Sequence, residues 1–138
     1  MTENELLDYP SKWFILMHKS LYEEDQNLVG FRDVDEWSPI FEGELVVYYQ
    51  FGYQRIRGIY EVIESRKHIN RSYGFEVDDI GLPYQCRLEL IYPMECYFDT
   101  YHAEKLSFYK HLKNPVRWDS RRAFEIRDAD LKYILSLA

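Results

Sequence analysis

The chain has 138 residues, which suits a single domain spanning residues 1–138 and allows a core without disulfides or metals. It is 46% hydrophobic and 17% aromatic, and its net charge of −7 argues against tight, non-specific duplex binding, which depends on many Lys and Arg side chains. No apolar run approaches the roughly 20 residues of a membrane-spanning helix and the start is acidic, so we expect an intracellular, cytoplasmic protein with no membrane partner.

The N-terminal part is predicted to form a helical turn and then a strand. Thr2 and Glu5 have the spacing of a capping box, which predicts a helical turn within an N-terminal extension of residues 1–11. The apolar run Trp13–Met17 is short and is bounded by polar residues, which is typical of a buried strand.

Two short helices are predicted to follow this strand. Ser20 and the acidic residues Glu23–Asp25 that follow it predict a helix over about 21–28, because negative charge stabilises a helix N-terminus. The segment Gly30–Asp33 is predicted to be a connection. Its last residue can cap a short helix that runs towards Phe41.

The middle of the chain is predicted to be a β-hairpin. Leu45–Tyr49 and Ile56–Ile63 are rich in β-branched and aromatic residues, and Gly52 lies in the short link between them. Residues 65–83 are polar and contain several Asn, Gly and Asp residues. They predict a long surface loop, a kind of segment that is often functional.

The last third is predicted to contain one further strand and two helices. Tyr84–Tyr92 alternates as a strand does and ends at Pro93, and Tyr97–Phe98 can continue the sheet. Apolar residues recur at helical spacing over Ala103–Leu112, and Asp128 is predicted to cap a terminal helix. This order of elements predicts an α+β fold, a mixed β-barrel with short helices at its periphery.

No pattern of residues indicates catalysis or a bound cofactor. The four histidines and two cysteines show neither HxxxH nor CxxC spacing, so no zinc site is predicted. Cys86 and Cys96 lie too far apart along one extended segment to pair, and we expect reduced thiols. A Gly-rich phosphate loop and a GxSxG motif are also missing. We therefore expect no metal, no cofactor and no enzymatic activity.

The remaining signal is a set of residue types that can hold a splayed-out base. Aromatic rings at strand ends can stack on a base, and arginines in the later half can contact phosphates. Residues 1–50 carry eleven acidic and three basic side chains, whereas residues 51–138 carry thirteen acidic and fourteen basic ones. Any phosphate-facing surface is therefore expected in the later part of the chain.

Four segments strengthen this interpretation by their order and spacing. They are Lys12–Ser20, Gly30–Asp33, Phe41–Tyr49 with Ile56–Val62, and Arg117–Ser120 with Asp128–Ala138. In turn they resemble an opening strand ending in Lys-Ser, a Gly-Val-Arg-Asn motif, a Gly-Asp-leading strand followed by Ile-Val-Gly-Ile-x-Glu-Val, and a closing loop with a terminal helix. These are features of the EVE domain family, which is similar to the YTH readers of methylated adenine within the PUA-like superfamily.

The resemblance implies a PUA-like barrel with a pocket for a modified base in DNA or RNA. The residues that it places at the base are Lys19, Ser20, Phe31, Arg32, Tyr49 and Trp118. Because stacking returns only about 1–3 kcal/mol per base, phosphate contacts must add affinity. We expect these contacts from Arg55, Arg57, Arg66, Lys67, Arg117, Arg121 and Arg122. Related domains target modification-dependent restriction systems, which implies a nuclease or ATPase as a further partner.

Two other functions stay open at this point. Leu28 and Val29 stand where the family usually carries a Trp before the Gly. The first alternative is therefore a protein-interaction or regulatory domain that has kept the fold and lost the base pocket. An enzyme that acts on nucleic acid is the third reading, and it rests only on paired acids such as Asp78 and Asp79.

Overall fold

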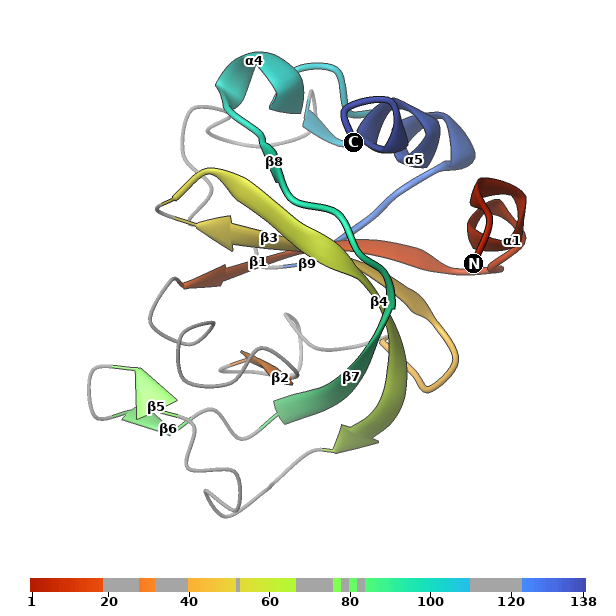
Figure 1. Cartoon of the computed structure of the whole chain (residues 1–138). Coiled ribbons are helices and arrows are strands. Elements are labelled where there is room, and N and C mark those ends of the chain that lie inside the picture. The colour runs from red at the N-terminus through yellow and green to blue at the C-terminus, as the bar shows by residue number, and fades with distance from the viewer. Residues whose placement is uncertain are drawn as a thin grey trace.

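The computed structural model describes residues 1–18, 28–31, 40–51, 53–66, 76–77, 80–81, 84–109 and 123–138. Within these ranges the chain forms one large sheet, a small two-stranded ribbon and three short helices (Figure 1). None of the helices described is long and apolar enough to cross a membrane.

The large sheet has seven strands, six of them side by side in the order β2-β7-β4-β3-β1-β9. The strands are β1 (Lys12–His18), β2 (Leu28–Phe31), β3 (Leu45–Phe51), β4 (Arg55–Arg66), β7 (Tyr84–Tyr92), β8 (Cys96–Tyr97) and β9 (Ala123–Glu125). β1 and β3 run parallel, β8 adds to β4, and the other pairings are antiparallel. A separate ribbon pairs β5 (Glu76–Val77) with β6 (Ile80–Gly81).

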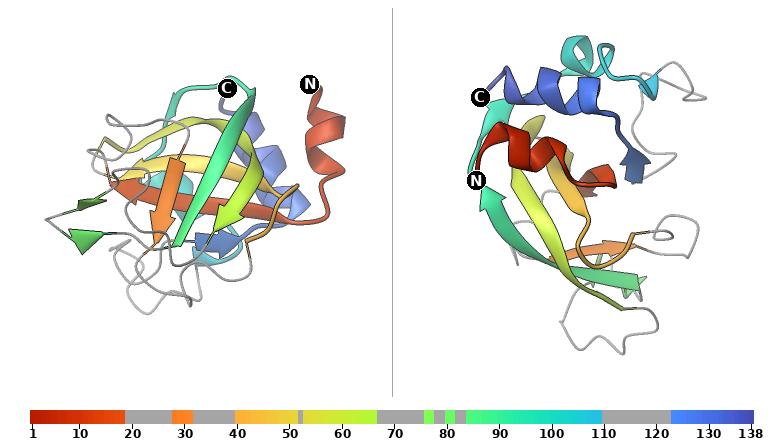
Figure 2. Two further views of the ribbon diagram at one scale, coloured as in Figure 1. Left: turned by 90° about the horizontal axis from the view of Figure 1, so that it is seen from below. Right: turned by 90° about the vertical axis from the view of Figure 1, so that its right-hand side faces the viewer.

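The large sheet is curved but open. β4 has twelve residues and bends, so that β7 and β2 come to lie across from β1 and β3 (Figure 2). Register shifts in the pairing of β4 with β3 and with β7 accompany this bend, as bulges do. Among the described strands β2 and β9 stay unpaired edges. The mixed α+β class is therefore confirmed, whereas the β-barrel expected from the sequence is not formed, because the described sheet does not close.

A bulge in the hairpin depends on Gly58. Tyr48 pairs with Gly58 and Tyr49 pairs with Ile56, which makes Arg57 the extra residue on β4. Gly58 has φ +148°, a conformation that favours glycine. A Cβ at this position would also lie 2.8 Å from Leu90 Cδ1.

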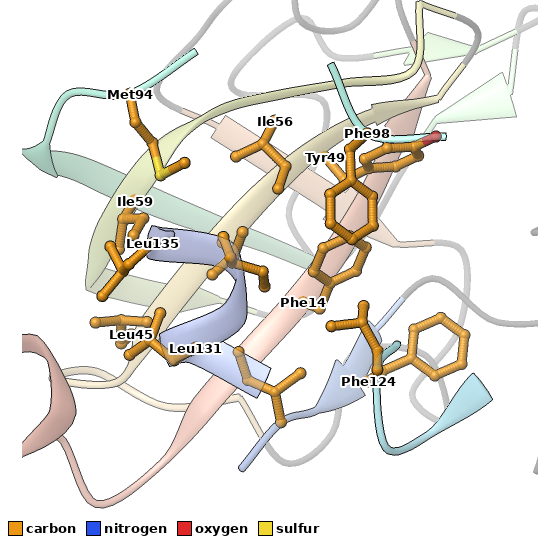
Figure 3. Close-up of a cluster of buried hydrophobic side chains, with 14 of the residues drawn as sticks. Phe14, Leu45, Tyr49, Ile56, Ile59, Met94, Phe98, Phe124, Leu131 and Leu135 are labelled. Atoms are coloured by element: carbon orange, nitrogen blue, oxygen red, sulfur yellow. The ribbon is translucent and has the colours of Figure 1, made fainter. Parts of the chain in front are cut away.

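The helices α1 (Glu3–Leu7), α4 (Thr100–Ala103) and α5 (Asp128–Leu135) cover one face of the sheet (Figure 1). The main core lies beneath them, and Phe14 stands at its centre. The Phe14 ring centroid is 5.4 Å from that of Tyr49 and 5.5 Å from that of Phe98 (Figure 3). It is 5.8 Å from the ring centroid of Phe108. One aromatic cluster thus joins β1, β3 and the segment that follows β8.

The opposite face of the sheet is concave, and we call it the inner face. Its side chains alternate along the strands with those of the main core, as a period of two requires. The buried hydrophobic residues on it are Trp13, Ile15, Val46, Tyr48, Tyr60, Val62, Cys86 and Leu88. Gln50 shares this face at the end of β3 and is fully buried.

The predicted strands agree better with the structure than the predicted helices. The capping box of Thr2 is confirmed, because its hydroxyl accepts the Glu5 N–H. The helix expected over Ala103–Leu112 was wrong, since α4 ends at Ala103 and single turns continue to Tyr109. The observed helix α4 starts earlier than the predicted one, because the Asp99 carboxylate accepts the His102 N–H and so fixes the helix N-terminus at Asp99.

Two further differences concern the ends of elements. Gly30 and Phe31 belong to β2, not to a connection, because they pair with Gln85 and Tyr84 of β7. The terminal helix is confirmed, although its N-cap is Arg127 and not Asp128. The helix expected over about 21–28 lies outside the described residues except for its last position, which begins β2, and the helix expected before residue 40 also lies outside them.

Tyr9, which follows α1, is expected to make the fold less stable at high pH. The Tyr9 hydroxyl donates to Glu61 Oε1 at 2.5 Å, and burial together with this hydrogen bond raises the pKa of Tyr9 to about 12. Unfolded tyrosine ionises near pH 10, so this stabilisation is complete below pH 10 and is lost as the pH rises towards 12. We expect urea unfolding to show a free energy that falls over this window. Tyr9→Phe should make the decrease in unfolding free energy smaller, whereas Tyr101→Phe, at an exposed ring, should leave it unchanged. An equal decrease in the unsubstituted protein and in both variants would contradict the role of Tyr9.

Candidate nucleic-acid interface

The C-terminal ends of β1 and β3 lie side by side. The two strands are parallel, and the pairing runs from Lys12 with Leu45 to His18 with Phe51. Lys19 and Ser20 follow directly after β1 but lie outside the described residues. The strand that leads into the predicted Lys-Ser pair therefore ends beside the strand that carries Tyr49.

β9 brings a second predicted segment to the same strand. Ala123 pairs with Ile15 and Glu125 with Trp13, in antiparallel register. The chain therefore enters β9 at the end that faces the C-terminal half of β1. Four residues of the predicted site precede Ala123 in the sequence but are not among the described ones: Arg117, Trp118, Arg121 and Arg122.

Tyr49 is the base-pocket residue whose side chain the structure describes. Its ring is 2% exposed and packs against Phe14 and Phe98 in the main core, on the helix-covered face (Figure 3). Burial raises the pKa of Tyr49 to about 12. The described contacts of the Tyr49 ring therefore belong to the main core.

Gln50, the next residue, places a polar group on the inner face where β1 and β3 end. Its side chain is fully buried, and its Oε1 accepts a hydrogen bond of 2.5 Å from Arg57 Nε. Arg57 also forms an ion pair with Glu95, whose carboxylate is exposed. Gln50 was not predicted as a site residue, although a polar side chain inside the apolar run Leu45–Phe51 is a signal for it.

Arg57 is consequently held in place by protein groups. The bulge directs its guanidinium to Gln50 and Glu95, and the side chain is 18% exposed. The geometry favours a role in orienting the Gln50 amide over the phosphate contact expected from the sequence.

The other predicted phosphate contacts on β4 lie at its two ends. Arg55 is exposed at the start of the strand, and Arg66 ends it. Eleven residue steps of a strand correspond to roughly 36 Å along its path. Gln85 of β7 pairs with both Arg66 and Gly30, so Arg66 lies at the same end of the sheet as Phe31. Only the backbone position of Phe31 is described. Arg32 and Lys67 follow these strands outside the described residues.

A cleft of about 380 Å³ opens between the turns after α4 and the junction of β9 with α5. Its lining residues are Ser107, Phe108, Glu125, Ile126 and Arg127. The Phe108 ring lies parallel to that of Phe124 at 4.3 Å, which gives the cleft an aromatic side. Arg127, which was not predicted as a site residue, adds an exposed cation. A volume of this size is in the range of small-ligand sites.

The described residues include two cysteines and several acidic and histidine residues, which are residue types that can hold a metal ion. Among these described residues, no group of three or more His, Cys, Asp or Glu side chains is arranged to hold one. Cys86 and Cys96 are free thiols, and burial raises the pKa of Cys96. Asp78 and Asp79 lie outside the described residues.

Comparison with known proteins finds likeness at the level of structure. No family model and no curated protein matches the chain. The protein PSPTO5229 from Pseudomonas syringae superimposes with a TM-score of 0.63 at 11% identity, covering 91% of this chain and 98% of its own. The Mmi1 YTH domain gives a TM-score of 0.61 at 10% identity, with coverages of 92% and 86%. The YTH domain of Zygosaccharomyces rouxii MRB1 in complex with N6-methyladenosine RNA gives 0.56 at 15% identity, with coverages of 91% and 86%.

These likenesses show that the chain has a YTH-like fold. The match extends over almost the whole chain and over most of each YTH domain. The identities of 10–15% show the fold alone.

Proposed function

We propose that this domain is a non-catalytic reader of a modified base in a nucleic acid strand, of the EVE type within the YTH-like fold. The observation that carries the proposal is the fold itself, because a neighbour with it binds N6-methyladenosine RNA. The EVE-like segments in the sequence agree with this assignment. The resemblance to EVE domains also supports a targeting role beside a nuclease or an ATPase, for which co-purification with the tagged protein is the measurement.

The strand order supports a pocket near the ends of β1 and β3. The two strands end beside one another, and β9 starts from the neighbouring side of β1. The segments that contain Lys19, Ser20 and Trp118 are connected to these strand ends. We propose that these three residues, with Phe31 and Arg32, hold the base, and that the Gln50 amide, oriented by Arg57, contributes polarity at the same end of the inner face.

Binding to matched oligonucleotides tests the proposal. Labelled single strands should carry either an unmodified base or one of N6-methyladenine, 5-methylcytosine and 5-hydroxymethylcytosine, as DNA and as RNA. We expect one modified strand to bind at least about five-fold more tightly than its unmodified partner, which corresponds to the lower end of base stacking energies.

Substitution of Trp118 should abolish that preference. Trp118→Ala removes the ring proposed to stack on the base, so the ratio of the two dissociation constants should fall to about one while the melting temperature is kept. Phe41→Ala is the control, because Phe41 carries an exposed ring and is not among the residues proposed for the pocket. Equal affinity of the unsubstituted protein for every strand in the panel would reject the modified-base reader and favour an interaction domain.

A further inference from the structure

A group of exposed tyrosines lies where the β3–β4 turn, β8 and α4 meet. We define the tyrosine surface as Tyr53, Arg55, Tyr97, Tyr101 and Lys105. The three rings are 42%, 50% and 62% exposed. They are three of the seven large hydrophobic side chains exposed in the described part of the chain, so this surface is not an even scatter of apolar residues.

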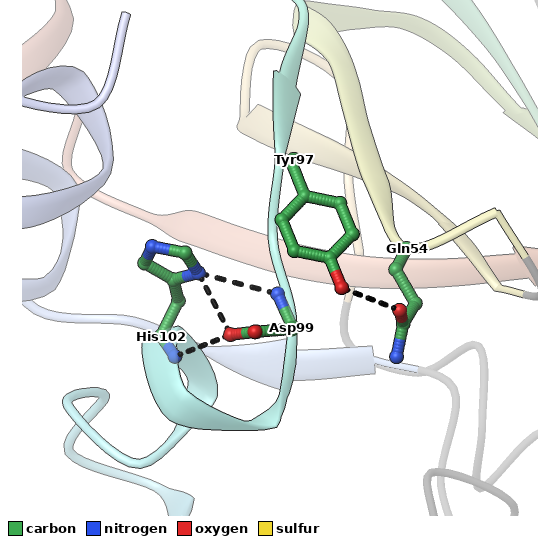
Figure 4. A network of polar contacts seen from close by, with 4 residues as sticks. All are labelled: Gln54, Tyr97, Asp99 and His102. Carbon is green, nitrogen blue, oxygen red and sulfur yellow. Dashed lines mark hydrogen bonds and ion pairs between the residues drawn. The ribbon is translucent and has the colours of Figure 1, made fainter.

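Hydrogen bonding and strand pairing hold Tyr97 against the hairpin turn. Tyr97 on β8 pairs in register with Arg55 on β4. Its hydroxyl donates to Gln54 Oε1 at 3.0 Å (Figure 4). Gln54 has φ +54° and lies between Tyr53 and Arg55 in the turn. The backbone of the turn and the ring of Tyr97 therefore fix one another.

His102 links the two most exposed rings to the core. Its ring stacks on buried Phe98 at 5.5 Å and meets the rings of Tyr97 and Tyr101 edge to face at 6.4 and 5.7 Å. The imidazole is itself tied to Asp99, with Nδ1 2.9 Å from Oδ1 (Figure 4). Rings supported in this way lose little conformational freedom when a ligand binds.

Two exposed cations, Arg55 and Lys105, lie beside the exposed rings. Lys105 Nζ lies 4.8 Å from the centroid of the Tyr101 ring. Arg55 is exposed, and no carboxylate in the described part of the chain forms an ion pair with it. The Asp99 carboxylate is directed to His102, and the exposed Glu104 is the acidic neighbour of Lys105 in the sequence. The surface thus combines open rings with two cations in a protein of net charge −7.

We propose that the tyrosine surface binds single-stranded nucleic acid, as a second contact region separate from the base pocket. Exposed aromatic rings next to cations are the means by which proteins bind single strands without sequence preference, since every base has a face that can stack. In a duplex the bases are stacked on one another, so few base faces are available to stack on these rings. The inference rests on the proposed function, because that function makes nucleic acid the ligand.

Fluorescence anisotropy with an unmodified 20-nucleotide single strand and its duplex tests the surface. Tyr97→Ala combined with Tyr101→Ala should weaken single-strand binding by at least about five-fold per ring removed. The pair Tyr97→Phe and Tyr101→Phe keeps the rings and should keep the affinity. Arg55→Gln with Lys105→Gln should reduce the slope of log affinity against log salt concentration by about 0.7 per cation. Phe41→Ala and Lys132→Gln, an exposed ring and an exposed cation elsewhere, should change neither quantity.

The affinity for unmodified strands and the preference for modified ones separate the two proposals. If the Ala pair weakens binding to modified and unmodified strands equally, the surface acts as proposed. If the unsubstituted protein prefers a modified strand but the Ala pair binds as tightly as before, the surface is rejected and the reader stands. If the Ala pair weakens binding although no modification is preferred, the surface stands and the reader is rejected. Duplex binding as tight as single-strand binding also overturns the inference.

Discussion

Replacing Tyr49 by Ala is expected to lower the free energy of unfolding by about 3–5 kcal/mol. The Tyr49 ring is 2% exposed, stacks on Phe14 at 5.4 Å and meets Phe98 edge to face at 5.9 Å. Removing it leaves a cavity at the centre of the main core, and neither aromatic neighbour can fill that cavity without leaving its own contacts. Urea unfolding at neutral pH is the measurement.

Tyr49→Phe separates this role in the core from a role in the base pocket. The substitution keeps the ring, so we expect at most about 1 kcal/mol of destabilisation, the size of one hydrogen bond. If Tyr49 belongs to the core, Tyr49→Phe should keep the preference for a modified strand unchanged. A Tyr49→Ala protein that unfolds like the unsubstituted one but loses that preference would place the ring at the base and contradict the core assignment.

The sequence predicts the strands well because their signals are local. Trp13–Met17, Leu45–Tyr49 and Tyr84–Tyr92 each carry a run or an alternation that specifies an extended segment without reference to the rest of the chain. β9 was not predicted, because its three residues Ala123–Glu125 form a strand only through pairing with β1. The start of α4 was missed because one short capping box at Asp99 overrides the apolar spacing that continues beyond Ala103.

The candidate site depends on long-range register, which the sequence does not display. The pairing of β3 with β1 decides which of the two adjacent tyrosines faces the helices. Tyr49 lies on the same face as Leu45 and Val47, in the main core, whereas Tyr48 lies on the inner face. The bulge at Gly58 then turns Arg57 to Gln50. A residue-by-residue resemblance gives identities at these positions but not the face on which each one lies.

Replacing Asp130 by Ala is expected to destabilise the protein by about 3 kcal/mol or more. Asp130 is 3% exposed, and its carboxylate accepts hydrogen bonds from the Ser107 N–H at 2.7 Å, the Ser107 hydroxyl at 2.6 Å and the Arg127 N–H at 2.9 Å. The substitution removes the acceptor from three donors at once. It also disconnects the start of α5 from Ser107, which lines the cleft together with Arg127.

Two weaker substitutions show whether the loss comes from these hydrogen bonds. Ser107→Ala removes only the hydroxyl donor and should cost about 1 kcal/mol, while Glu125→Ala, at an exposed carboxylate of the same cleft, should cost less than about 0.5 kcal/mol. Hydrogen exchange at the Ser107 and Arg127 amides should accelerate in Asp130→Ala by more than at the amides of β3. Exchange that accelerates equally in β3 would mean that the carboxylate stabilises the whole fold, and that the cleft is not held together locally by Asp130.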